Sequence, residues 1–528
     1  MAGAAFVSGG CRVDETDIHR WEKTVYGPEK LKAVLIHDKY ETPLQVEAAL
    51  SLIRMEPRQG RHVGLGILLE GLSAIPAEAR QPIWATLIPA IIAELRRPPP
   101  VPSPAGQPAP EDPSYPYKDA AFMVLSAEPP ILDDEVQKQN LKTALIEWVL
   151  ADFERRLDNR QQAYGMEQLL RLIGAPAVAG LPKLLNREAR RLDQTASLIA
   201  ELGDPATKAA ASEQLASVAR WTLSSEWLQQ KKPELQKANE ASKLAPTEKQ
   251  LEAQLAQYQD EELFRLFGSM RKIGGRPVVE FLLGVASDPA QGEKRRQAAL
   301  AALEKQLSKD NPEDLRRVLG IVTKDAPDAV LDQAFRRIGE LPREQIAESL
   351  YGLFKMDKWK TRRAAAATLL RLSTVKHIDE FLGKLPEPKG FALPEAITYG
   401  ALLGDLKEGV PVDALRPHLT KGSPTARASA VAYYFTFGKP ADLEVLKPLE
   451  SDGTRAPTCD ADPDCKWTCE VAKSGSAERE QREITTIGEF VRYCIEPAVE
   501  ERSTPPENRA GAPLEKADKT EEKPTEKR

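Results

Sequence analysis

Four of the five cysteines lie in one short stretch near the C-terminus, where sulfur chemistry is the strongest chemical signal in the sequence. Cys459, Cys465, Cys469 and Cys494 are separated by five, three and 24 residues, and no histidine lies between them. Zinc sites usually contain close CxxC pairs, which place two thiolates on one ion, and neither close pair here has that spacing. We therefore favour two disulfides over a zinc site, with all three pairings open.

The same stretch contains alternating acidic residues, as at the start of a calcium-binding loop. Asp460, Asp462 and Asp464 occupy the first, third and fifth places of such a loop. Its sixth place needs glycine and its twelfth an acidic residue, but these hold Cys465 and Val471. A solvated acidic turn is the better interpretation, and we predict no metal site.

Residues with the spacing of a known catalytic motif are missing from the sequence. None of the five histidines lies in an HExxH motif, and none is followed by a second histidine four residues later. No GxSxG, phosphate-binding P-loop or GxGxxG occurs either. We therefore expect a binding protein with no catalytic residue, no cofactor and no small-molecule substrate. The histidines are His19, His37, His62, His377 and His418.

The N-terminus, MAGAAFVSGGC, places small residues before a cysteine. It resembles a bacterial lipobox, in which that cysteine is acylated, although Ser8 stands where leucine is usual. The basic and most of the apolar parts of a secretory signal are missing, and a translation start upstream of Met1 would supply them. The resemblance implies that residues 1–18 are a signal remnant, lipobox and tether, that Cys11 is lipidated, and that Arg12 permits sorting to the outer membrane. An even four cysteines then remain, which suits an oxidising compartment.

Composition narrows the class of partner. The formal net charge of the 528 residues is −6 and the pI is about 5.8, which argues against nucleic acid. We interpret the basic run around Trp359 as a solvated helix start. No run of about 18 apolar residues exists, so we expect membrane contact only through the lipid.

Internal repetition is the strongest architectural signal. Six apolar residues that are each followed by glycine mark expected helix ends, where glycine can adopt the left-handed conformation. From Gly274 to Gly438 the equivalent ends fall in steps of 33, 32, 34, 31 and 34 residues. Such a period fits two helices of three turns with two short connections. The six glycines are Gly174, Gly203, Gly274, Gly339, Gly404 and Gly438.

The repeated units resemble HEAT repeats, particularly short bacterial HEAT-like repeats. Apolar stripes at helical spacing flank the break at Asp288-Pro289, and the second helices begin with an Arg-x-x-Ala-like pattern at Arg296, Arg363 and Arg427. The resemblance implies an all-α solenoid, or superhelix, of helical hairpins. An irregular helical bundle is the alternative. Because one hairpin cannot bury both of its stripes, neighbours must stack and the ends need caps.

Composition shifts give the expected organisation. We predict N-terminal HEAT-like helices at 19–97 and a Pro-rich linker at 98–116, with nine prolines in nineteen positions and no helix. A repeat array follows at 117–450, with protruding helices near 225–262. A cysteine-stapled cap at 451–500 and a disordered charged tail at 501–528 complete the chain.

The sequence therefore predicts a non-enzymatic scaffold that binds an unknown protein partner. Its resemblance to bacterial HEAT-repeat lipoproteins places it in the cell envelope, on the periplasmic side of the outer membrane. The alternative is a cytoplasmic HEAT-like adaptor with a C-terminal zinc site. An enzyme resembling HEAT-like bilin lyases is a third option, for which no motif is present.

Overall fold

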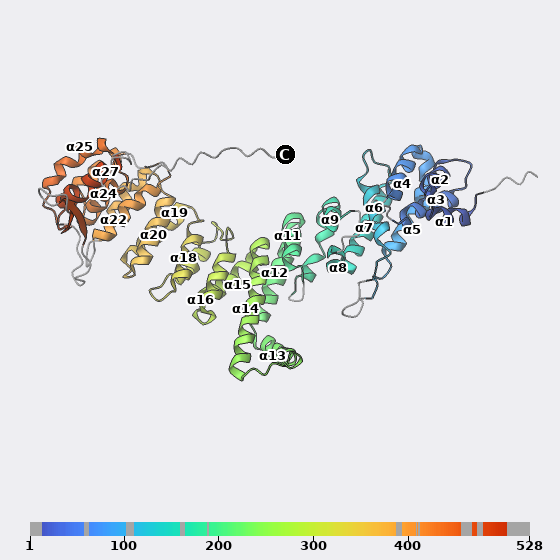
Figure 1. Ribbon diagram of the computed structural model, residues 1–528, viewed down its shortest axis with the longest axis horizontal. Coiled ribbons are helices and arrows are strands. Elements are labelled where there is room, and N and C mark those ends of the chain that lie inside the picture. Colours follow the sequence, from blue (N-terminus) through green and yellow to red (C-terminus); the bar gives the residue numbers. More distant parts are fainter. Residues whose placement is uncertain are drawn as a thin grey trace, which may run out of the picture. The chain divides into compact units, whose positions relative to one another are not determined.

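The computed structural model describes most of the chain as helices (Figure 1). The described residues are 13–56, 63–101, 110–158, 164–186, 190–386, 393–407, 409, 412–455, 467–472 and 479–503. The chain forms two compact units, Met1–Phe281 and Leu282–Arg528. Across the described ranges, no helix is both long and apolar enough to cross a membrane.

Helices of the first unit follow one another along the chain with short connections. They are α1 (Glu15–Glu22), α2 (Gly27–Ile36), α3 (Thr42–Arg54), α4 (Val63–Ala74), α5 (Ala77–Leu95), α6 (Tyr115–Ser126), α7 (Glu135–Ala151), α8 (Phe153–Asp158), α9 (Met166–Ile173), α10 (Ala175–Val178), η1 (Leu181–Leu184), α11 (Leu192–Leu202), α12 (Pro205–Thr222), α13 (Ser225–Ala241) and α14 (Glu248–Ile273), with α15 (Arg276–Ser287) spanning the unit boundary.

The second unit continues the helical pattern and ends in a small mixed segment. Its elements are η2 (Pro289–Gln291), α16 (Gly292–Ala302), α17 (Pro312–Ile321), α18 (Asp328–Ile338), α19 (Arg343–Gly352), η3 (Leu353–Lys355), α20 (Trp359–Arg371), η4 (Val375–His377), α21 (Ile378–Gly383), α22 (Leu393–Leu402), η5 (Leu403–Asp405), α23 (Val412–Thr420), α24 (Pro424–Phe437), η6 (Pro440–Asp442), α25 (Leu443–Leu446), η7 (Lys447–Ser451), β1 (Thr468–Ala472), β2 (Arg479–Glu483), α26 (Ile487–Phe490), η8 (Val491–Ile495) and α27 (Glu496–Ser503).

Helices in both units stack in chain order. In the first unit α2 packs on α4, α3 on α5, and α5 on α7. In the second unit α16, α18, α20, α22 and α24 form a continuous series, while α17, α19 and α23 pack against α18, α20 and α24. Each helix thus buries its apolar stripe against the next pair, as repeat proteins require. The expected all-α class of stacked hairpins is confirmed, and an irregular bundle is excluded.

The Pro-rich stretch connects helices that pack together. On either side of it, α5 contacts α6 and α7 directly. Two adjacent arginines of α8 hold both flanks: Arg155 donates to the carbonyl of Pro100 at 2.8 Å, and Arg156 pairs with Asp112 at 2.8 Å. Helix α6 begins at Tyr115, inside the range predicted to lack helix, because proline is tolerated in the first turn.

Only two of the six helix-ending glycines have a positive φ, and neither adopts the expected left-handed helical conformation, because ψ is −147° at Gly174 and −152° at Gly274. Gly174 and Gly274 have φ of 77° and 66°. The remaining four have ordinary backbone angles. Glycine is needed there because neighbouring atoms leave no room for a side chain: a Cβ on Gly404 would lie 2.3 Å from the ring of Phe437. The same crowding, from the helix's own carbonyl or a neighbouring side chain, occurs at Gly203, Gly339 and Gly438.

Buried or half-buried arginines recur at the start of alternate second helices and bind the end of the preceding segment. Each guanidinium satisfies carbonyls that have no partner within their own helix or turn. The predicted Arg363 is exposed, and its neighbour Arg362 takes this role because the helix turns that side chain inward. The bonds are Arg296 to Ala286 O (2.9 Å), Arg362 to Met356 O (2.6 Å) and Arg427 to Leu419 O (3.1 Å).

The end of the second unit contains a β-hairpin that sequence reasoning missed. Strands β1 and β2 are antiparallel, with Thr468 opposite Glu483 and Ala472 opposite Arg479. Helix α27 then packs on α24 and reaches Ser503, so residues 501–503 are not part of a disordered tail. Arg502 fixes them, because it donates to the carbonyl of Phe435 at 2.7 Å at the end of α24.

Candidate functional site

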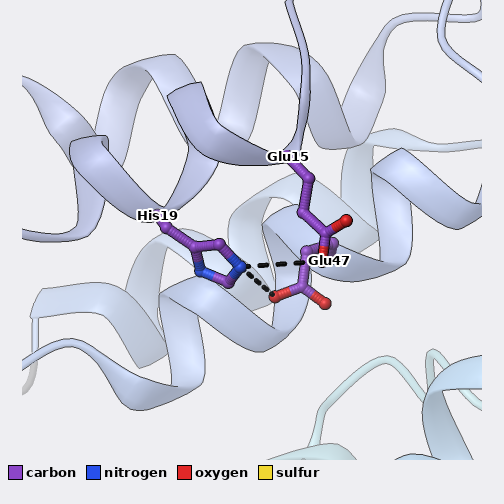
Figure 2. Close-up of side chains that lie close together, drawn as sticks. All are labelled: Glu15, His19 and Glu47. Atoms are coloured by element: carbon purple, nitrogen blue, oxygen red, sulfur yellow. Dashed lines mark ion pairs between the residues drawn. The ribbon is translucent and has the colours of Figure 1, made fainter.

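Three side chains near the start of the first unit bring potential metal ligands together (Figure 2). Glu15 and His19 lie one turn apart on α1, and Glu47 projects from α3, which packs on α1. The Nε2 atom of His19 is 3.7 Å from an oxygen of Glu15 and 3.8 Å from one of Glu47. One nitrogen and two carboxylate oxygens are a donor set that zinc accepts.

An arginine beside this cluster already neutralises part of its charge. Arg54 donates to Glu47 at 2.6 Å and to Glu22 at 2.8 Å. Burial opposes the charge of Arg54, but these two carboxylates raise its pKa above the ordinary value. Its guanidinium also lies 3.5 Å from Nδ1 of His19. The cluster is therefore best described as an ion-pair network joining α1 and α3.

A groove of about 780 Å³ adjoins this network. Its carboxylates would attract a cationic side chain, and its apolar wall would cover the aliphatic part of that side chain. Sequence reasoning missed both features, although the Glu-x-x-x-His spacing at residues 15–19 places its two side chains on one helix face. The groove is lined by Val13, Asp14, Glu15, Lys39, Tyr40, Glu41, Pro43, Leu44 and Glu47.

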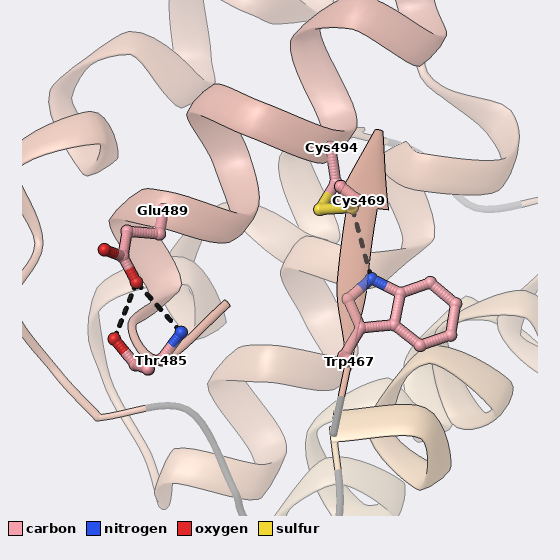
Figure 3. Close-up of a disulfide and its surroundings, with 5 residues drawn as sticks. All are labelled: Trp467, Cys469, Thr485, Glu489 and Cys494. Carbon is pink, nitrogen blue, oxygen red and sulfur yellow. Dashed lines mark hydrogen bonds between the residues drawn. A yellow bond between two sulfur atoms is a disulfide. The ribbon is translucent and has the colours of Figure 1, made fainter. Parts of the chain in front are cut away.

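The structure joins two of the predicted cysteines, Cys469 of β1 and Cys494 of η8, in a disulfide (Figure 3). The indole Nε1 of Trp467 lies 3.3 Å from Sγ of Cys469. Sulfurs that are bonded to each other are not thiolates, so in this state neither can serve as a zinc ligand. Cys459 and Cys465 lie outside the described residues, and so does Cys11, whose lipidation stays a prediction.

The helix that leads into Cys494 is fixed by a capping interaction, also visible in Figure 3. Glu489 accepts hydrogen bonds from the backbone nitrogen of Thr485 at 2.9 Å and from its hydroxyl at 2.6 Å. These bonds lower the pKa of Glu489. In the reciprocal bond the backbone N–H of Glu489 donates to the hydroxyl oxygen of Thr486, and together these bonds fix the start of α26 and hence the position of η8.

The basic run around Trp359 is engaged within the chain. Lys358 and Lys360 both pair with Asp328, at 3.1 and 3.3 Å. Arg362 pairs with Glu395 at 2.5 Å. These three side chains thus bind α20 to its neighbours instead of being free in solvent as predicted, while Arg363 is exposed.

A lysine with a lowered pKa is a common nucleophile, and burial lowers the pKa of Lys118. Its side chain is completely buried and forms an ion pair with Asp119 at 2.5 Å. It also donates to the carbonyl of Tyr164, while Asp119 accepts from the backbone of Tyr164. The pair therefore anchors the chain at Tyr164 to α6, with no access for a substrate.

Helices α13 and α14 follow each other in a helical hairpin with apolar side chains in solvent. The packing on α13 is thin, because Trp227 is its one buried apolar side chain. The ring of Trp227 stacks on Tyr258 of α14 at 6.1 Å between centroids. Leu244, in the connection between the two helices, is 57% exposed. Further exposed apolar side chains on this hairpin are Leu228, Tyr258 and Phe264.

No family model matches the sequence, and no curated protein matches it. Among solved structures, the karyopherin Kap121p bound to the SUMO protease Ulp1p aligns with 83% of this chain and 43% of its own length, at 10% identity and a TM-score of 0.33. Kap121p bound to Pho4p aligns with 83% and 48%, at 12% identity and a TM-score of 0.27. An engineered protein aligns with 83% and 99%, at 13% identity and a TM-score of 0.22.

The chain thus spans less than half the length of these two karyopherin chains. TM-scores below 0.5 support no argument about fold or function, so the fold assignment depends on the helix packing itself.

Proposed function

We propose that the chain is a non-enzymatic helical-repeat scaffold that binds another protein. The observation that carries this proposal is the chain-order stacking of α16, α18, α20, α22 and α24. In such a stack each helix is buried on the sides that meet its neighbours and remains open on another. A partner can therefore contact equivalent positions on several consecutive helices, which is how repeat proteins build extended binding surfaces.

We further propose that the scaffold is anchored in the bacterial envelope through acylated Cys11 and faces the periplasm. The lipobox-like sequence supports the anchor. The Cys469–Cys494 disulfide is what an oxidising compartment would allow. The same disulfide disfavours a zinc-binding cytoplasmic adaptor, which would need free thiols at the C-terminus.

Fractionation of a bacterial host separates these two parts of the proposal. The gene is expressed together with the DNA that precedes it, as wild type and as Cys11→Ala, and in-cell cross-linking precedes affinity capture. We expect the wild type in the outer-membrane fraction with a discrete cross-linked protein. Cys11→Ala should leave the membrane yet recover the same protein. Finding the wild-type protein in the cytoplasmic fraction would exclude the lipid anchor. If neither form captured any cross-linked protein, the proposed role as a protein-binding scaffold would be excluded.

A further inference from the structure

We propose that the Cys469–Cys494 disulfide is a latch that holds the β1–β2 hairpin on the last helices, so that a dithiol reductant opens the C-terminal cap. The hairpin joins these helices through β1 and η8, which pack together (Figure 3). Reduction of this bond would expose the surface of the last helices, whichever protein the helical array binds.

The hairpin has little apolar contact of its own. All five side chains of β2 are exposed. Among the strand side chains that the structure describes, Cys469 is the one that is buried, at 9% exposure. A two-stranded hairpin without a buried face is at best marginally stable in water. The covalent bond to Cys494 therefore supplies the anchor that a hydrophobic face would normally provide.

Among the described residues, further contacts of the hairpin with the helices lie at its margins. Trp467 packs edge-on against Phe435 of α24, with centroids 6.2 Å apart. The guanidinium of Arg482 lies 3.9 Å from the ring centroid of Tyr493. Ile484 is buried just after β2, and its backbone N–H donates to the carbonyl of Trp467 at 2.9 Å, a bond that extends the β1–β2 pairing and does not reach the helices. Cation–π and edge-on aromatic contacts contribute little at exposed sites, so they should not hold the hairpin alone.

Beneath the hairpin lies an aromatic surface that its departure would uncover. Phe435 is half-buried, and its ring lies 5.8 Å from that of Phe490, which is fully buried. Phe435 belongs to α24, and α27 packs directly on that helix. The last unit of a helical array needs such a cover, because no further helix pair follows to bury its exposed apolar side.

The chemistry of opening is ordinary thiol–disulfide exchange with a dithiol reductant. One thiolate of the reductant attacks a sulfur of the pair, forms a mixed disulfide and displaces the other cysteine as a thiolate, which takes up a proton. The second thiol of the reductant then displaces the remaining cysteine. The two cysteines gain two electrons and two protons, and the dithiol becomes a disulfide.

Hydrogen exchange on the folded protein tests the latch. A Cys459→Ser/Cys465→Ser background leaves Cys469–Cys494 as the C-terminal pair, and dithiothreitol is the probe. We expect exchange in peptides covering 467–472 and 479–486 to accelerate about 30-fold or more on reduction, since disulfides of this kind typically contribute a few kcal/mol. Peptides from α18 and α20 should not change, and binding of a hydrophobic dye should rise.

A matched variant shows whether the effect belongs to this bond. Cys469→Ser/Cys494→Ser in the same background should exchange rapidly without reductant, and dithiothreitol should add nothing. If this variant does not fold, hydrogen exchange of the folded parent during titration with dithiothreitol still shows whether reduction releases the hairpin. Unchanged protection of the hairpin after complete reduction, verified by thiol alkylation, would overturn the proposal.

Discussion

Arg362 and Glu395 stand 33 residues apart, one repeat period, and their side chains meet at 2.5 Å between α20 and α22. Both are 14% exposed. Burial raises the pKa of Glu395 and Arg362 partly offsets this rise. The guanidinium also lies over Trp359, whose ring contacts Tyr399 of α22. Arg362 also donates to the carbonyl of Met356, just before α20. The same arginine thus stabilises the start of its own helix and links that helix to α22.

The first prediction concerns this junction. Arg362→Ala leaves Glu395 largely buried without its cation, and we expect a loss of about 3 kcal/mol in the free energy of unfolding. Urea denaturation measures it. The matched control is Arg171→Ala, which breaks the more exposed pair with Glu201 and should cost less than about 1 kcal/mol. Equal losses in the two variants would contradict the account.

The contact between α22 and α24 gives the second prediction. A Cβ on Gly400 would lie 2.7 Å from both the carbonyl carbon of Ala432 and the carbonyl oxygen of Ser429. Gly400→Ala must push the helices apart, and we expect a loss of about 1–3 kcal/mol. Gly320→Ala in α17, where a Cβ meets nothing within 4 Å, should be neutral or stabilise by up to about 1 kcal/mol. Thermal unfolding of the two variants checks the contrast, which fails if Gly400→Ala is tolerated equally well.

The third prediction is a pH dependence at the Pro-rich connection. Burial favours the neutral form of Asp112, but hydrogen bonds from Ser114 and Arg156 hold its pKa below the ordinary value. The ionised form therefore stabilises the fold above the ordinary pKa, and this contribution disappears as pH falls through the lowered value. Asp112→Asn should cost about 3 kcal/mol at pH 7, and the difference from wild type should shrink below about pH 4. A constant difference from pH 7 to pH 3 would contradict this.

Cysteine connectivity supplies the fourth prediction. With Cys469 bound to Cys494, the expected second disulfide must join Cys459 to Cys465. Digestion without reductant, followed by mass spectrometry, should recover both linked peptides. The Cys469→Ser variant should expose one new free thiol, on Cys494. A peptide linking Cys459 or Cys465 to Cys494 in the wild type would refute the pairing.

Periodic, local features could be predicted from the sequence, whereas long-range partners could not. Helix pairs and their period follow from apolar stripes and from glycines such as Gly274, because helix ends depend on nearby residues. The choice of Arg362 over Arg363 depends on which side of α20 faces the preceding segment, a packing detail that spacing cannot give. The same holds for Glu47, which meets His19 only because α3 packs on α1.

In the C-terminal segment, too, local features could be predicted from the sequence and long-range contacts could not. Its cysteines indicated a cross-linked cap, but alternating charged residues in β2 gave no apolar pattern from which a strand could be recognised. The helical ending at Ser503 was missed because Arg502 is held by carbonyls of α24, more than sixty residues away in sequence. Local composition alone favours disorder there.

Photo-cross-linking at exposed positions on consecutive second helices tests the scaffold most directly. A photoreactive residue is placed singly at Lys294, Asp332 or Arg363, on α16, α18 and α20, in the full-length protein. A partner lying along the stack should be captured as the same protein from neighbouring helices, with the cross-links on that protein progressing in one direction. Capture of unrelated proteins at each position, or none at any exposed position on these helices, would contradict the account.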